Sequence, residues 1–110
     1  HDSNTYFDKV VESNYMSFAP KVKEEYHEKL KAITHVDETS RLQTVSKIKG
    51  HKVFTEILEE LKSRNEIPVI LNTSFNIRGF PILTTIEDAL HVLDNTELDH
   101  VVVEGYIFSK

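Results

Sequence analysis

The spacing of apolar residues changes along the chain and predicts an alternation of strands and helices. Between residues 52 and 64 apolar side chains recur at i, i+3, i+4 and i+7, which is typical of one face of a helix. These residues are Phe54, Ile57, Leu58 and Leu61. Two overlapping capping-box spacings, which begin at Thr84 and Thr85, predict the start of a second helix with its own apolar stripe. That stripe is Ile86, Ala89, Leu90 and Leu93.

Four short segments are predicted as strands. Tyr15–Ala19 is an apolar run closed by Pro20, and Arg41–Val45 alternates between polar and apolar residues. Ile67–Leu71 is a continuous apolar run, which is typical of a strand buried on both faces of a sheet. His100–Val103 begins a final strand. The connecting segments are predicted as a short helix or turn over residues 1–13, a solvated helix at most over 21–31, and a polar loop over 35–40.

Strands that alternate with helices over short connections predict an α/β (α+β) domain, a twisted mixed sheet with helices packed on its faces. The 110 residues have room for one small domain. An apolar fraction of 39% is near the average for globular domains, so the chain can bury a core. The polar loops at the ends of the sheet are the expected place for a site.

Composition excludes several classes of function. The chain has no cysteine, so it has neither a disulfide framework nor a thiol nucleophile, and the cytoplasm is the expected location. Its apolar runs are far shorter than the ~20 residues of a membrane span. A net charge of -5 argues against nucleic-acid binding, which needs a surplus of basic residues. The histidines show neither an HxH nor an HExxH spacing, so no metal site is expected.

The most polar loop directly follows the predicted buried strand. Residues 72–81 read NTSFNIRGFP, which provides amides, hydroxyls, a guanidinium and a glycine where ligands collect in open α/β sheets. Arg78 could pair with phosphate at two points, and Gly79 would allow a tight turn. The alternative is a capped turn without a ligand, because Asn, Thr and Ser commonly bond to nearby backbone in loops.

A second polar cluster brings a histidine, acids, hydroxyls and an arginine together in residues 34–41. Only three of the thirteen basic residues are arginines, and Arg41 and Arg78 stand beside predicted strand ends. Because arginine suits planar recognition of phosphate or carboxylate, both are candidates for binding an anion. The alternative for each is an ordinary surface ion pair with one of the eighteen acids.

These two clusters, in this order, resemble the C-terminal domain of the NodU/CmcH carbamoyltransferase family. The resemblance rests on Thr34–Val45 (THVDETSRLQTV) and Ile67–Gly79 (IPVILNTSFNIRG), followed by Pro81-Ile82 and Thr85–Leu90. It covers about Ser13–Lys110, and paired motifs with a helix between them are specific. The domain boundaries that we expect are therefore residues 1–12 as the remnant of a preceding segment and 13–110 as the family's YrdC-like domain, incomplete at its N-terminus.

The resemblance implies a function that composition and periodicity do not show. In that family the YrdC-like domain forms carbamoyladenylate from carbamoyl phosphate and ATP with Mg²⁺. A separate N-terminal Kae1-like domain of the same polypeptide, which carries iron or another divalent metal, then transfers the carbamoyl group to an acceptor hydroxyl. Neither nucleic acid nor a membrane is an expected partner. The alternative is a module that binds nucleotide or phosphate without catalysis, or a purely structural domain.

Carried over residue by residue, the resemblance implies that Arg41, Asn72 and Ser74 bind the nucleotide and carbamoyl phosphate. His35, Thr39 and Arg78 lie in the same motifs, and their roles follow from position and chemistry. No residue is assigned as a covalent catalyst. The family pattern differs at two places, with Asp-Gly-Thr-Ala-Arg in place of Asp37-Glu38-Thr39-Ser40-Arg41 and an acid in place of Phe80. The family's earlier basic segment is also missing, so we expect these 110 residues alone not to complete carbamoyl transfer.

Overall fold

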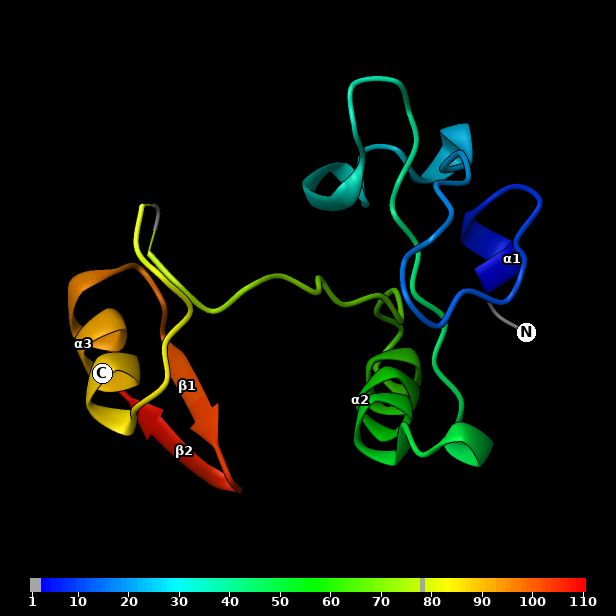
Figure 1. Cartoon of the computed structure of the whole chain (residues 1–110). Coiled ribbons are helices and arrows are strands. Elements are labelled where there is room, and N and C mark those ends of the chain that lie inside the picture. The colour runs from blue at the N-terminus through cyan, green and yellow to red at the C-terminus, as the bar shows by residue number, and fades with distance from the viewer. Residues whose placement is uncertain (1–2, 78) are drawn as a thin grey trace. The chain divides into compact units, whose positions relative to one another are not determined.

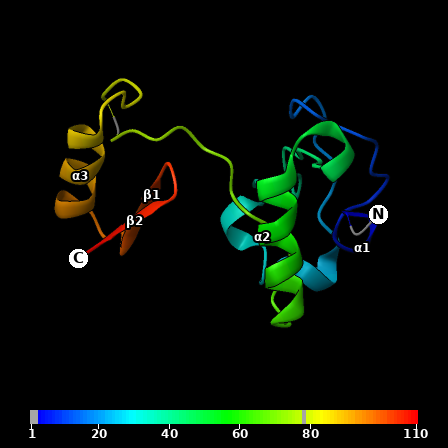
Figure 2. The same cartoon turned by 90° about the horizontal axis from the view of Figure 1, so that it is seen from below.

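The computed structural model describes residues 3–77 and 79–110, and the chain divides into two compact units, His1–Leu71 and Asn72–Lys110. The first unit contains the helices α1 (Ser3–Tyr6) and α2 (Lys52–Ser63) and three short 3₁₀ turns among its described residues (Figures 1 and 2). Those turns are Glu24–Tyr26, Lys31–Ile33 and Lys47–Lys49.

The core of the first unit forms around three buried side chains, Phe7, Val22 and Leu30. Phe7 and Val22 face each other across an isolated β-bridge, which links the end of α1 to the segment before the first 3₁₀ turn. The rings of Tyr6 and Tyr26 meet edge to face with centroids 4.8 Å apart, a favourable geometry for aromatic pairs. Partly buried side chains surround this core: Tyr6, Val10, Tyr26, Ile33, Leu42, Ile67 and Val69.

The segments predicted as the first two strands lie antiparallel, but as isolated bridges and not as continuous strands. Phe18 pairs with Leu42, one residue from each segment, and Lys21 pairs with Thr39 just outside them. Met16 has a φ of +54°, which interrupts an extended backbone, and Pro20 has no N–H to donate to a ladder. The sequence therefore predicted which segments pair, but it predicted continuous strands where the structure has single bridges.

Helix α2 begins and ends within a residue of the predicted bounds. No residue of α2 is buried, and two members of its apolar face, Phe54 and Ile57, are 51% and 44% exposed. The amphipathic pattern therefore predicted the bounds of the helix correctly, although its apolar face is only partly covered.

The prediction of a buried strand at Ile67–Leu71 is wrong. The segment forms no strand, and the N–H of Val69 donates to the carbonyl of Ile67 at 2.7 Å across Pro68, a three-residue turn. Ile67 and Val69 pack against the core of the first unit, whereas Ile70 and Leu71 are 42% and 62% exposed. The apolar run is explained by this packing on one side.

The second unit combines helix α3 (Ile86–Asn95) with an antiparallel hairpin, β1 (His100–Val103) and β2 (Tyr106–Ser109). Its core contains Ala89, Leu93 and Val101, with Val103 and Phe108 packed against them. The predicted helix and final strand are both confirmed. The Thr85 hydroxyl accepts a hydrogen bond from the Asp88 N–H at 3.2 Å, as the second of the two capping boxes predicts.

The chain has a small mixed α/β fold, as predicted. The sheet that its described residues form has two antiparallel strands, fewer than the predicted mixed sheet. The two strands are joined by Glu104 and Gly105, with φ values of +48° and +87°. Positive φ at both central residues is the geometry of a tight type I′ hairpin turn. None of the helices in the described part of the chain has the length and apolar character to cross a membrane.

Candidate functional site

The turn over residues 35–41 is held together by hydrogen bonds within its own chain. The N–H of His35 donates to the carbonyl of Thr39 at 2.7 Å, and the N–H of Glu38 donates back to the carbonyl of His35 at 2.9 Å. One oxygen of Asp37 accepts from both the hydroxyl and the N–H of Thr39, at 2.6 and 3.1 Å. These bonds, first of all the one from the hydroxyl, lower the pKa of the Asp37 carboxyl from its usual value. Asp37 therefore fixes the position of Thr39.

A neighbouring segment supports the turn through its backbone. The N–H of Val22 donates to the carbonyl of Glu38 at 2.9 Å, and the N–H of Ser40 donates to the carbonyl of Pro20 at 3.0 Å. Two residues further on, the N–H of Leu42 donates to the carbonyl of Phe18 at 3.1 Å. The predicted motif is thus built on residues 18–22, which the sequence analysis did not assign to the site.

Arg41 is exposed on this turn, and its Nη2 donates to the carbonyl of Met16 at 3.3 Å. Among the described residues no carboxylate lies within ion-pairing distance of Arg41. Arg64, directly after the end of α2, is different, because its Nε donates to the Glu60 carboxylate at 2.8 Å in an ordinary surface ion pair. The alternative of a surface ion pair is therefore not found for Arg41 among the described residues, and Arg78 lies outside them. The charge of Arg41 is anchored by a neutral carbonyl and remains exposed to an anion.

Glu38, where the family pattern has glycine, adopts a left-handed backbone with a φ of +67°. This region costs most residues energy that glycine avoids. The Glu38 carboxylate lies 3.5 Å from Nζ of Lys21, and both side chains are more than half exposed. The structure therefore gives a conformational reason for a glycine at this place.

The second predicted loop, residues 72–81, belongs to the second unit. Asn72 and Ser74 are exposed at its start, and Arg78 lies outside the described residues. Gly79 has a φ of +87°, as expected of a glycine that permits a tight turn. The Asn76 side chain donates to the carbonyl of Phe80 at 2.9 Å, so this asparagine caps the turn. The capped-turn alternative is therefore correct for Asn76.

The structure brings three of the six predicted site residues together. His35, Thr39 and Arg41 share one turn of the first unit. Asn72 and Ser74 lie at the beginning of the second unit. The candidate site that the structure describes is therefore the 35–41 turn of the first motif.

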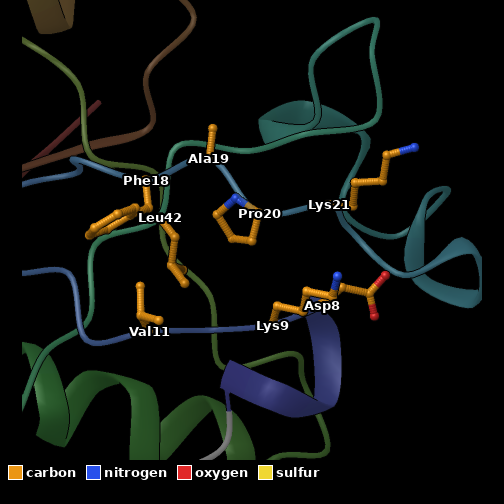
Figure 3. A pocket seen from close by; sticks show the side chains of 8 residues that line it. All are labelled: Asp8, Lys9, Val11, Phe18, Ala19, Pro20, Lys21 and Leu42. Carbon is orange, nitrogen blue, oxygen red and sulfur yellow. The ribbon is translucent and has the colours of Figure 1, made fainter.

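A pocket of about 420 Å³ lies on the first unit against the turn, and the sequence analysis missed it (Figure 3). Figure 3 shows Val11, Phe18 and Leu42 on one side, the ring of Pro20 in the middle, and charged side chains on the other side. The charged side chains are Asp8, Lys9 and Lys21. The run Phe18-Ala19-Pro20 was the available signal, but a proline after an aromatic residue is equally typical of a strand end.

The described residues do not form a cage for a divalent cation. Within residues 3–77 and 79–110, no three His, Asp or Glu side chains are grouped closely enough to hold a metal ion. Mg²⁺ that arrives with a nucleotide is held largely by phosphate oxygens and water, so the ion implied by the resemblance needs no such cage. The residues present fit an anion better than a free cation, because Arg41 has its charge exposed.

Comparison with known proteins agrees with the motifs. The family described as "Carbamoyltransferase C-terminus" matches residues 1–110. Nodulation protein NolNO of Sinorhizobium fredii is 38% identical over 112 residues, which cover 99% of this chain and 16% of that protein. Nodulation protein NolO of Bradyrhizobium diazoefficiens is 40% identical over 96 residues, 87% of this chain and 17% of that protein. Nodulation protein U of Rhizobium tropici is 36% identical over 99 residues, 87% of this chain and 16% of that protein. The chain thus spans about a sixth of the length of these relatives, and it belongs to the carbamoyltransferase C-terminus family.

Proposed function

We propose that this chain is the part of a carbamoyltransferase that binds carbamoyl phosphate and ATP and forms carbamoyladenylate from them. The observation that carries the proposal is the match of residues 1–110 to the carbamoyltransferase C-terminus family. The balance of the step is that carbamoyl phosphate loses its phosphate to water, and an oxygen of the resulting carbamate bonds to the α-phosphorus of ATP as pyrophosphate leaves. The carbamoyl group then passes to an acceptor hydroxyl in a Kae1-like domain of the longer polypeptide.

The chemistry of the first motif supports this proposal. Both substrates are phosphorylated, so their reaction gathers negative charge that fixed donors must stabilise. Arg41 offers an exposed guanidinium, and Thr39 is held in place by Asp37. When bound, Mg²⁺ on the phosphates supplies further neutralisation of charge. The protein's own contribution is to bind and orient the phosphates, which is the main part of catalysis in phosphoryl-type transfers.

Asn72 and Ser74 are the candidates of the second motif for contact with the substrates. Both side chains are exposed at the beginning of the second unit, where an amide and a hydroxyl can donate to phosphate or carbamoyl oxygens. Arg78 is the candidate guanidinium of that second motif in this proposal, and His35 belongs to the same turn as Arg41. No group of the site has to act as a covalent nucleophile.

A thermal-shift titration tests the proposal. The chain is melted with ATP and Mg²⁺, with carbamoyl phosphate, and with all three, in the unmodified form and as Arg41→Ala and Asn72→Ala. A ligand at a hundred times its Kd stabilises the native state by about 2.7 kcal/mol, so the melting temperature rises by several degrees. Both substitutions are expected to reduce that rise strongly.

The matched control is Arg64→Ala, because Arg64 is also an exposed arginine but forms an ion pair with Glu60 of α2. It is expected to retain the full rise. The proposal is contradicted if no ligand raises the melting temperature, or if Arg41→Ala and Arg64→Ala respond alike.

A further inference from the structure

We infer that the pocket beside the 35–41 turn seats the aromatic base of the nucleotide, with the phosphates toward the charged side of the pocket. This inference rests on the proposed function and adds to it the place of the base. The residues that line this pocket lie within residues 8–21 or are Leu42, and none of them was predicted as a site residue.

The size and walls of the pocket suit a flat, largely apolar group. Its volume of about 420 Å³ falls within the range of small-molecule sites, about 300 to 1,000 Å³. Val11, Ala19, Pro20 and Leu42 supply apolar surface. Phe18 is 53% exposed in a folded chain, so it has a face on which a base can stack. The apolar side therefore offers both contact area and an aromatic platform.

The opposite side of the pocket carries the charges that a phosphate needs. Two lysines, Lys9 and Lys21, stand there beside one acid, Asp8. Lys21 is 3.5 Å from Glu38, but both side chains are exposed, and such pairs contribute little. A phosphate group can therefore take the place of the Glu38 carboxylate. This separation of apolar and charged sides matches the two ends of a nucleotide.

The same backbone holds the pocket and the motif. Phe18 and Pro20 line the pocket, and their carbonyls accept the hydrogen bonds from Leu42 and Ser40 on either side of Arg41. Arg41 in turn donates to the carbonyl of Met16, two residues before Phe18. A base in the pocket thus lies against the segment that positions the arginine, so one ligand can reach both.

Calorimetric titration of the chain with three probes tests the inference: ATP, adenosine and inorganic tripolyphosphate. Stacking of a base on an aromatic ring contributes about 1 to 3 kcal/mol, so Phe18→Ala should weaken the binding of ATP and adenosine by about 5- to 150-fold. Tripolyphosphate should bind equally well to this variant. Phe18→Leu keeps the apolar volume and removes the aromatic face, so it should show the same selective loss with the fold retained. Lys9→Gln should weaken ATP and tripolyphosphate and leave adenosine unchanged.

Phe54→Ala is the control, since Phe54 on α2 is 51% exposed and lies outside the pocket. It should leave all three affinities unchanged. Equal effects of the Phe18 and Phe54 variants, or an absence of adenosine binding, would overturn the placement of the base. If tripolyphosphate still binds in a manner that depends on Arg41, the proposed function survives that outcome. Failure of all three probes to bind overturns both.

Discussion

The left-handed backbone at Glu38 predicts that glycine and alanine will have opposite effects at two glutamates of the first unit. Glu38 has a φ of +67°. A side chain with a Cβ in this region costs about 1 to 2 kcal/mol, which glycine avoids. Glycine loses more entropy on folding, by about 0.4 to 1 kcal/mol. Glu38→Gly should therefore be more stable than Glu38→Ala by about 1 kcal/mol.

Both variants remove the carboxylate and its ion pair with Lys21, so the loss of that pair cancels from the comparison. For a domain the size of the first unit, a difference of 1 kcal/mol corresponds to about 4 to 8 °C in melting temperature. Thermal unfolding followed by circular dichroism measures it, and urea unfolding gives the free energy independently.

Glu25 provides the control, because it is an exposed glutamate in the 3₁₀ turn Glu24–Tyr26 and is not among the residues with positive φ. There glycine should be less stable than alanine by about 0.5 to 1 kcal/mol. The order of the two variants should thus reverse between the two positions. If alanine is at least as stable as glycine at position 38, the left-handed turn and the explanation of the family's glycine are both wrong.

Two further predictions concern the helix cap and the acidic turn. Thr85→Ala removes the hydroxyl that caps α3 and should lower the free energy of unfolding of the second unit by about 1 kcal/mol, whereas Thr85→Ser should retain most of it; hydrogen exchange of the α3 amides measures the difference. The folded-state pKa of Asp37 is depressed by its bonds to Thr39, so its stabilising contribution is present above the pKa of an unfolded aspartate and is lost as the pH falls through the folded value. Melting temperatures measured from pH 7 down to pH 3 should therefore fall less steeply for Asp37→Asn, and parallel curves would refute this.

The sequence pattern predicted two helices correctly, one from a long apolar stripe and one from an apolar stripe that follows a capping residue. The stripe of α2 repeats over three turns, and α3 adds the threonine cap to its own stripe. The final strand was also predicted correctly, and its residues Val101–Val103 are β-branched, which favours a strand. In each case the signal is local, since a helix or a hairpin forms between residues close in sequence.

The short apolar run at Ile67–Leu71 shows where such reasoning stops. Continuous apolar residues fit a buried strand and a segment that covers a core equally well. Whether a β-ladder forms depends on a neighbouring strand, which periodicity cannot identify. In this segment the N–H of Val69 is already bonded to the carbonyl of Ile67 in a local turn around Pro68. The candidate site divides in the same way, since the motif residues were visible in sequence and the pocket that borders them was not.

The sequence by itself determined the family, the helices α2 and α3, the final strand and the residues of the 35–41 motif, because each depends on residue identity or on contacts within a few positions. Tertiary structure alone decided that residues 18–22 support this motif, that Arg41 is anchored by a carbonyl and not by an acid, and that Phe18 and Leu42 share a pocket. The physical reason is that these features are contacts between segments about twenty residues apart. Which distant segments meet depends on packing and hydrogen bonding across the whole unit.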